Sequence, residues 1–179
     1  DIIFLDEDEK FNNLIKMVNK ELSKRKRLFA DFGGEYTNYL KNSQDKNKLP
    51  IISIILNNFD GILEVYPDFT DDLIPIVRDC ARYGIIFILT INSDTLYRRL
   101  DESFPNRYTF KLSDTSEYRD IFSTTKKIEP RKIFGRGLVN NGEVHEFQTA
   151  SLLKDTTDEV KKLKEIGIKL RELNPTPVP

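Results

Sequence analysis

Two short runs of apolar residues interrupt an otherwise mixed pattern of hydrophobic and polar positions. Residues 51–56 read Ile-Ile-Ser-Ile-Ile-Leu after Pro50, and residues 85–91 form a second run after Gly84. Neither run alternates between apolar and polar positions. Such runs are typical of strands that are buried on both faces of a parallel sheet. We therefore predict two core strands in these positions.

Helical periodicity surrounds the two strands. Apolar residues recur every three or four positions after the acidic residues 6–9, and Gly33 and Gly34 end this first long helix. A second helix is expected after residues 70–72, with a glycine stop before the second strand. Further helices are predicted within residues 35–49, after a cap at residues 93–94, over residues 113–122 and over residues 157–173.

A β-hairpin is expected in the last third of the chain. The dipeptide Asn-Gly at 141–142 separates the runs 135–139 and 143–147, and Asn-Gly strongly favours a hairpin turn. Residues 107–112 alternate between apolar and polar positions and predict another strand. Strands that alternate with helices indicate an α/β fold with a mainly parallel sheet, to which the late hairpin would add an antiparallel edge.

Composition narrows the classes of function. The 179 residues carry 28 basic and 29 acidic side chains, so the chain lacks the basic footprint of a nucleic-acid-binding protein. Its apolar runs are too short to cross a membrane as a helix. The lone cysteine, Cys80, excludes an internal disulfide and suits a reducing compartment. With a single histidine, His145, the chain cannot build a zinc site of the usual Cys/His type.

The polar residues that follow the two apolar runs are the first candidates for a site, because ligands of parallel sheets bind beyond the carboxyl ends of the strands. Asn57 and Asn58 follow the first run, and Thr90 lies near the end of the second. A strand that runs into two polar residues has the outline of a Walker B segment. Both residues are amides here, which are neutral and cannot act as bases near pH 7. A degenerate Walker B segment and a buried strand with an Asx-rich turn both stay open.

No P-loop accompanies this segment. A P-loop requires the pattern Gly-x-x-x-x-Gly-Lys-Ser/Thr between a strand and a helix. Gly33-Gly34 lacks the Lys-Ser/Thr pair, and the Gly-Arg-Gly sequence at 135–137 is too short. These 179 residues therefore cannot build a complete P-loop site.

Several short motifs occur in an informative order. They are Asp6-Glu7-Asp8-Glu9-Lys10, Lys24-Arg25-Lys26-Arg27-Leu28-Phe29, Leu49-Pro50-Ile51-Ile52, Asn57-Asn58-Phe59-Asp60, Tyr83-Gly84-Ile85, Leu89-Thr90, Gly135-Arg136-Gly137-Leu138 and Glu146-Phe147-Gln148. Together they resemble the FtsK/SpoIIIE-type ATPase modules of the type VII secretion motor, in particular the EssC branch of Gram-positive bacteria. The resemblance extends over residues 1–152.

The resemblance implies a RecA-like P-loop NTPase sheet whose amino-terminal part is missing. Residues 1–152 would form the carboxyl-proximal part of one module, residues 153–173 a charged helix, and residues 174–179 a proline-rich linker. ATP and Mg²⁺ would bind only together with the missing half.

The resemblance also implies a role. EssC-like motors are membrane-anchored, carry tandem modules on the cytoplasmic face of the plasma membrane, and export WXG100-type proteins. Neighbouring modules of the same polypeptide and a ring oligomer would be the partners, without nucleic acid. A binding module with a vestigial site, which recognises secretion substrates or a neighbouring module, is the alternative. A DNA translocase of the FtsK type is a further alternative, which the near-neutral charge opposes.

Residue roles follow from the same resemblance. Asn57 falls on the Walker B acid and Asn58 on the next position, so hydrolysis is in doubt. Thr90 falls where these ATPases place a polar sensor near the γ-phosphate, although an ordinary strand-end threonine fits equally well. Arg136 would contact a nucleotide or a neighbouring subunit, or bridge loops. Candidates for an arginine that acts on a neighbouring site are Arg98, Arg99, Arg107 and Arg119.

Other conspicuous residues have simpler interpretations. The basic cluster at residues 20–27 is expected to be a solvated helix face rather than a DNA contact. His145 has no triad-like partners and is expected to be structural. Cys80 lies on an apolar helical face and is expected in the core. No metal ligands are predicted.

Overall fold

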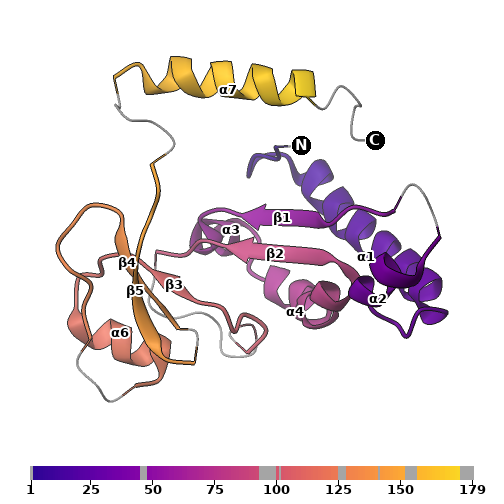
Figure 1. Cartoon of the computed structure of the whole chain (residues 1–179), viewed down its shortest axis with the longest axis horizontal. Coiled ribbons are helices and arrows are strands. Elements are labelled where there is room, and N and C mark those ends of the chain that lie inside the picture. The colour runs from indigo at the N-terminus through magenta and orange to yellow at the C-terminus, as the bar shows by residue number, and fades with distance from the viewer. Residues whose placement is uncertain are drawn as a thin grey trace.

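The computed structural model describes residues 2–44, 48–92, 100, 102–124, 128–140, 142–151 and 157–173. Two bodies of structure and a separate helix make up these residues (Figure 1). One body holds a parallel strand pair with its helices, and the other holds an antiparallel sheet with one helix. This confirms the predicted α/β fold with a parallel sheet and a late antiparallel hairpin.

Two strands form the parallel sheet. β1 (Ile52–Leu56) and β2 (Ile85–Leu89) pair in parallel, with Ile52 opposite Ile85 and Leu56 opposite Leu89. Both strands were predicted from their apolar runs. Because the register is flush, the two strands end side by side, and the residues that follow them meet at one edge of the sheet.

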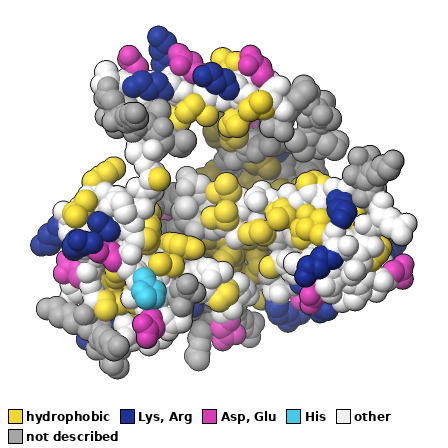
Figure 2. Space-filling model, in the orientation of Figure 1, with side chains coloured by type: hydrophobic (Ala, Val, Ile, Leu, Met, Phe, Trp, Pro, Cys, Tyr) yellow, Lys and Arg dark blue, Asp and Glu magenta, His cyan; other side chains and the backbone are white. Residues whose placement is uncertain are grey.

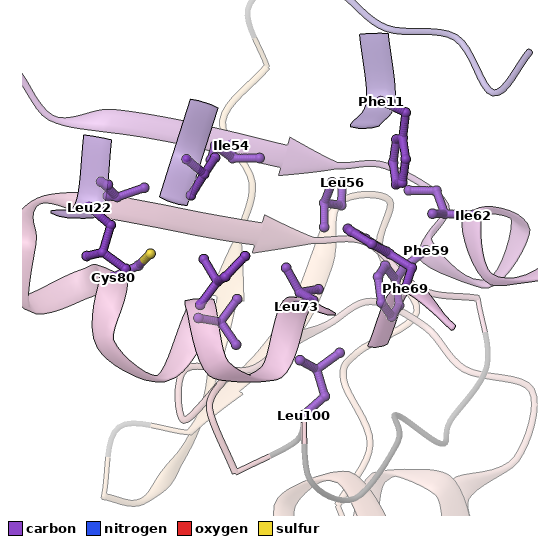
Figure 3. Packing of buried hydrophobic residues seen from close by; sticks show 14 residues of the cluster. Phe11, Leu22, Ile54, Leu56, Phe59, Ile62, Phe69, Leu73, Cys80 and Leu100 are labelled. Carbon is purple, nitrogen blue, oxygen red and sulfur yellow. The ribbon is translucent and has the colours of Figure 1, made fainter. Parts of the chain in front are cut away.

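The helices α1 (Asp8–Ala30) and α4 (Phe69–Cys80) supply most of the core. Their apolar stripes pack against the side chains of Ile54, Leu56 and Ile85, as Figure 3 shows for Leu22, Leu73 and Cys80 among others. Leu73 is fully buried. Cys80 is also buried, as predicted, and desolvation by burial raises the pKa of its thiol to about 11. The thiol therefore stays protonated at neutral pH.

Only one face of the parallel sheet is covered, so the prediction of strands buried on both faces is wrong for the described residues. Ile54 and Leu56 are buried, whereas Ile55 is 65% exposed and Ile88 is 47% exposed. The reason is that successive side chains of a strand point to opposite faces, and the helices of the core cluster pack on the face of Ile54. Within the described part of the chain, the opposite face stays exposed, and Figure 2 shows hydrophobic side chains at the surface over the two strands.

The basic cluster of α1 is not uniformly solvated, which corrects a second prediction. Arg25 is 1% exposed. Its guanidinium donates to the carbonyl oxygens of Pro50 (2.7 Å), Tyr83 (2.9 Å) and Gly84 (3.2 Å), and its Nε donates to Glu21 (2.8 Å). A buried charge is tolerated when it is paired and its hydrogen bonds are satisfied. Arg25 thus ties α1 to the backbone that leads into both strands.

Two short helices complete this body. α2 (Tyr36–Asn42) packs its tyrosines on Phe29, and confirms the predicted helix after Gly34. α3 (Phe59–Val65) begins directly after the strand-end amides, where a turn was predicted. A one-turn 3₁₀ helix, η1 (Ala81–Tyr83), follows α4. Gly84 then turns the chain into β2 with a φ of 73°, a conformation that favours glycine.

The antiparallel sheet contains β3 (Tyr108–Thr109), β4 (Arg136–Asn140) and β5 (Val144–Gln148), in that order. The hairpin therefore forms its own sheet instead of an edge of the parallel one. Within the predicted strand 107–112, only two residues pair. α6 (Thr115–Phe122) covers this sheet, and its first turn is capped by Asp114, whose Oδ1 accepts the N–H of Ser116 at 2.8 Å.

The last helix, α7 (Glu159–Leu173), lies apart from both sheets in Figure 1. It confirms the predicted charged helix, and none of its side chains is buried. None of the helices that the structure describes is long and apolar enough to cross a membrane. The predicted linker at 174–179 and the predicted helix after 93–94 lie outside the described residues.

Candidate functional site

The site candidate lies at the edge where β1 and β2 end. Backbone pairing continues past both strands, because Thr90 N–H donates to Leu56 O (3.1 Å) and Phe59 N–H donates to Thr90 O (2.8 Å). This pairing places Asn57 and Asn58 directly beside Thr90. In Figure 1, the antiparallel sheet lies on the side of the molecule toward which both strands point.

Three of the predicted site residues meet here. The hydroxyl of Thr90 donates to Oδ1 of Asn57 at 2.8 Å and accepts the backbone N–H of Asn58, also at 2.8 Å. All three residues are exposed. Thr90 thus links the two strand ends through its side chain as well as through its backbone.

Asn58 has a special backbone conformation. Its φ of 55° and ψ of 62° lie in the left-handed region, which asparagine adopts more readily than most residues. Its side chain folds over the first turn of α3, where a Cβ at Gly61 would lie 2.5 Å from Asn58 Nδ2. Gly61 therefore leaves the room that the Asn58 amide occupies.

Two further residues belong to this cluster, although sequence reasoning assigned them no role. Asn92 Nδ2 donates to Asn58 Oδ1 at 3.0 Å, and the backbone N–H of Asn92 donates to Oδ2 of Asp60 at 2.7 Å. Both residues stand just beyond a strand end, and that position was the signal that could have found them. We call residues 57, 58, 60, 90 and 92 the strand-end cluster.

The strand-end cluster is poor in charge. Asp60 is its only ionisable side chain, and it contains no lysine or arginine. Within the described residues, no three His, Cys, Asp or Glu side chains come together to hold a metal ion. Mg²⁺ in proteins is held by oxygens, usually including one or two carboxylates. The residue at the end of β1 is the neutral amide Asn57 instead of a carboxylate, and Oδ2 of Asp60 supports the backbone of Asn92, so the residues present fit a Mg²⁺ site poorly.

The two predicted arginines lie in the second body. Arg107 donates from Nη1 to Ile121 O (2.6 Å) and from Nε to Phe104 O (3.3 Å), so it bridges backbone segments around α6. Arg136 begins β4 and lies on the same sheet face as Glu146. The contacts seen for Arg107 and Arg136 are thus with backbone around α6 and with Glu146, respectively.

Arg136 shares Glu146 with Arg131. The carboxylate of Glu146 accepts the backbone N–H (2.6 Å) and Nε (2.8 Å) of Arg131, and lies 3.9 Å from Arg136 Nη1. The hydrogen bond from the Arg131 backbone is the main reason that the pKa of Glu146 is lowered. Nε of Arg136 is buried and, among the described residues, has no hydrogen-bond partner.

The remaining candidates are dispersed. Arg119 is exposed on α6, and His145 is exposed on β5. Arg98 and Arg99 lie outside the described residues. The structure therefore gathers Asn57, Asn58 and Thr90, and it places the described candidates Arg107, Arg119 and Arg136 in the second body.

This fold, with its polar cluster at the ends of parallel strands, is that of a P-loop ATPase domain. A solved structure of EssC (ATPases 2 and 3) from Geobacillus thermodenitrificans matches the whole chain with a TM-score of 0.82 and 27% identity, and the chain covers 35% of that structure. The cytoplasmic domain of EssC also matches the whole chain, with a TM-score of 0.70 and 26% identity, and the chain covers 36% of it.

The curated relatives that the chain resembles are proteins of type VII secretion systems. The ESX secretion system protein EccC of Geobacillus thermodenitrificans (strain NG80-2) is 29% identical over 99% of this chain, which spans 13% of the relative's length. Further relatives are ESX or type VII secretion system proteins as well. These relatives and solved structures confirm the resemblance to the ATPase modules of type VII secretion motors. No family model matches the chain.

Proposed function

We propose that this chain is part of an ATPase-like module of a type VII secretion motor, with a degenerate nucleotide site that regulates the motor and hydrolyses ATP poorly. The observation that carries the proposal is the amide of Asn57 at the Walker B position, hydrogen-bonded to Thr90. The module would bind nucleotide together with a P-loop, which these 179 residues do not contain.

The chemistry of the strand-end cluster supports poor hydrolysis. Phosphoryl transfer depends on metal ions that neutralise developing charge and on a residue that orients the attacking water. Asn57 and Asn58 are neutral amides, which do not act as bases near pH 7 and lack the charge of a metal-binding carboxylate. The carbonyl oxygen of Asn57 also accepts a hydrogen bond from Thr90, and that of Asn58 accepts one from Asn92.

Arg136 is the better supported of the two arginines proposed to contact a nucleotide or a neighbouring subunit. Its buried Nε has no partner among the described residues, and its side chain is 19% exposed. Arg107, in contrast, donates to two backbone carbonyls. Guanidinium groups suit phosphate contacts because of their planar, forked geometry.

We also propose a wider setting, which the names of the relatives as secretion system proteins support. We place the module on the cytoplasmic face of the plasma membrane, as part of a membrane-anchored protein that exports WXG100-type proteins. Neighbouring ATPase modules of the same polypeptide would be its partners, and the assembly would form a ring. The near-neutral charge supports a protein rather than DNA as cargo.

A turnover assay tests this function. The intact gene product is assayed for ATP hydrolysis with Mg²⁺ after the other modules have been inactivated by mutation. Turnover well below about 1 s⁻¹, the lower end of ordinary enzyme rates, is expected. Turnover at or above that rate that disappears in an Asn57→Ala variant would contradict a degenerate site.

A binding module is the second candidate, and exposed apolar surface favours it. Phe134 is fully exposed beside the hairpin, and Tyr108 and Phe110 are more than half exposed. These surfaces could receive a secreted protein or a neighbouring module. Calorimetry of the intact gene product with ATP and, separately, with a peptide from an export substrate distinguishes the two candidates. Peptide binding without ATP binding favours the binding module.

A further inference from the structure

The side-chain oxygen atoms of Asn57 and Asn58 point toward other residues of the strand-end cluster. Asn57 Oδ1 accepts the hydroxyl proton of Thr90, and Asn58 Oδ1 accepts a proton from Asn92 Nδ2. A hydroxyl has a single proton to donate, and Thr90 donates it to Asn57 while it accepts the backbone N–H of Asn58. Both side-chain carbonyls are thus engaged within the cluster.

The amide nitrogen of Asn57 is available instead. Oδ1 and Nδ2 diverge from the same planar carbon, so an oxygen held against Thr90 turns the nitrogen away from it. Asn57 is exposed, and in the described part of the chain no hydrogen bond engages its Nδ2. Two N–H donors are therefore presented at the end of β1.

The carboxylate of Asp60 is not a substitute for a Walker B acid. Asp60 lies in the first turn of α3 and is half-buried. Its Oδ2 accepts the backbone N–H of Asn92 at 2.7 Å and so fixes the chain beyond β2. An acid used in this way supports the loop, whereas a Mg²⁺ ligand has to direct its oxygens at the ion.

From this donor set we propose that the strand-end cluster contacts nucleotide phosphate directly, through Asn57 Nδ2, and that nucleotide binding at this module does not require Mg²⁺. The inference rests on the proposed function, because it assumes that nucleotide occupies this edge. An amide N–H donates to a phosphate oxygen, which is an acceptor, but it cannot coordinate a cation. An aspartate at position 57 would instead coordinate a cation and repel a phosphate oxygen.

The experiment measures ATP binding by the intact gene product in two buffers, one with excess Mg²⁺ and one with EDTA. The contribution of this site is the difference between the wild type and Asn57→Ala in each buffer. We expect Asn57→Ala to weaken binding by a similar factor in both buffers. The wild-type dissociation constant at this site should differ less than about threefold between them, a change well below 1.4 kcal/mol.

An Asn57→Asp variant gives the sharpest contrast. The new carboxylate repels phosphate without metal and provides an oxygen ligand with it. Binding by Asn57→Asp should therefore fall at least about tenfold in EDTA and recover with Mg²⁺. Asn42→Asp is the matched control, because it makes the same charge change on an exposed residue of α2, away from the strand ends. It should leave both measurements unchanged.

The outcomes separate the inference from the proposed function. If the Asn57-sensitive binding of the wild type collapses in EDTA, nucleotide binds but needs Mg²⁺, and the inference is overturned while the function stands. If neither Asn57 variant changes ATP binding in either buffer, nucleotide does not reach this edge, and both fail. The unfolding temperature of each variant is compared with that of the wild type, so that a change in ATP binding can be distinguished from a loss of folding.

Discussion

The hydroxyl of Thr90 and Oδ1 of Asn57 lie 2.8 Å apart and join the ends of β1 and β2, although the two residues are 33 positions apart in the sequence. The same hydroxyl accepts the backbone N–H of Asn58. One small side chain therefore sets the orientation of the Asn57 amide and supports the left-handed turn at Asn58.

Replacement of Thr90 by valine should loosen the strand-end cluster. The change keeps the β-branched shape and removes the hydroxyl, so Asn57 Oδ1 and the Asn58 N–H lose their shared partner. Because both groups are exposed to water, we expect a loss of about 0.5–1.5 kcal/mol in the free energy of unfolding. Urea unfolding measures it, with exposed Thr37→Val as the control. Equal effects of the two variants would contradict a bridging role.

Arg25 should be among the most sensitive positions in the chain. Arg25→Ala removes the donor for the carbonyls of Pro50, Tyr83 and Gly84 and leaves Glu21 without its closest cation. Loss of one partner of a buried pair costs about 3–5 kcal/mol. The free energy of unfolding should fall by that amount, whereas exposed Arg27→Ala should change it by less than about 0.5 kcal/mol. Similar losses would mean that Arg25 acts as an ordinary surface residue.

Glu21 should make stability depend on pH in the acidic range. Desolvation acts to raise its pKa, but the hydrogen bond from Arg25 and the charges of Lys24 and Arg25 outweigh it, so the folded-state pKa lies below 4.5. A lowered folded-state pKa contributes stability above the unfolded pKa, and this contribution is lost as the pH falls through the folded value. Glu21→Gln should therefore flatten the fall in the free energy of unfolding below about pH 5. An unchanged slope would exclude Glu21 as its source.

Gly137 should tolerate no side chain. A Cβ there would clash with the carbonyl oxygen of Thr109 and lie 2.6 Å from the ring of Phe147. Gly137→Ala should separate β3 from β4 and cost about 1–3 kcal/mol, as overpacking does. Gly167→Ala on α7 is the matched control, because nothing lies near its Cβ and alanine favours helices. Thermal unfolding should show opposite shifts for the two variants.

Much of the fold could be predicted because the patterns involved are local. The β-branched runs before Asn57 and Thr90, the stop at Gly84 and the Asn-Gly hairpin each act through a few neighbouring residues. The helix α3 was missed because its start follows a left-handed residue, Asn58, which looks like a turn in sequence. The short pairing of β3 was missed because it depends on how closely β4 approaches, and Gly137 permits that approach.

The sequence by itself determined where the strands lie, that amides follow β1, and that no P-loop is present in these residues. Only the tertiary structure decided that one face of the parallel sheet is exposed within the described residues, that Arg25 is buried, and that Asn92 and Asp60 complete the cluster. The physical reason is the distance along the sequence over which each interaction acts. Helix and strand patterns express interactions between near neighbours, whereas the backbone carbonyls that Arg25 binds and the side chains that Asn92 binds lie 25 to 59 residues away in the sequence.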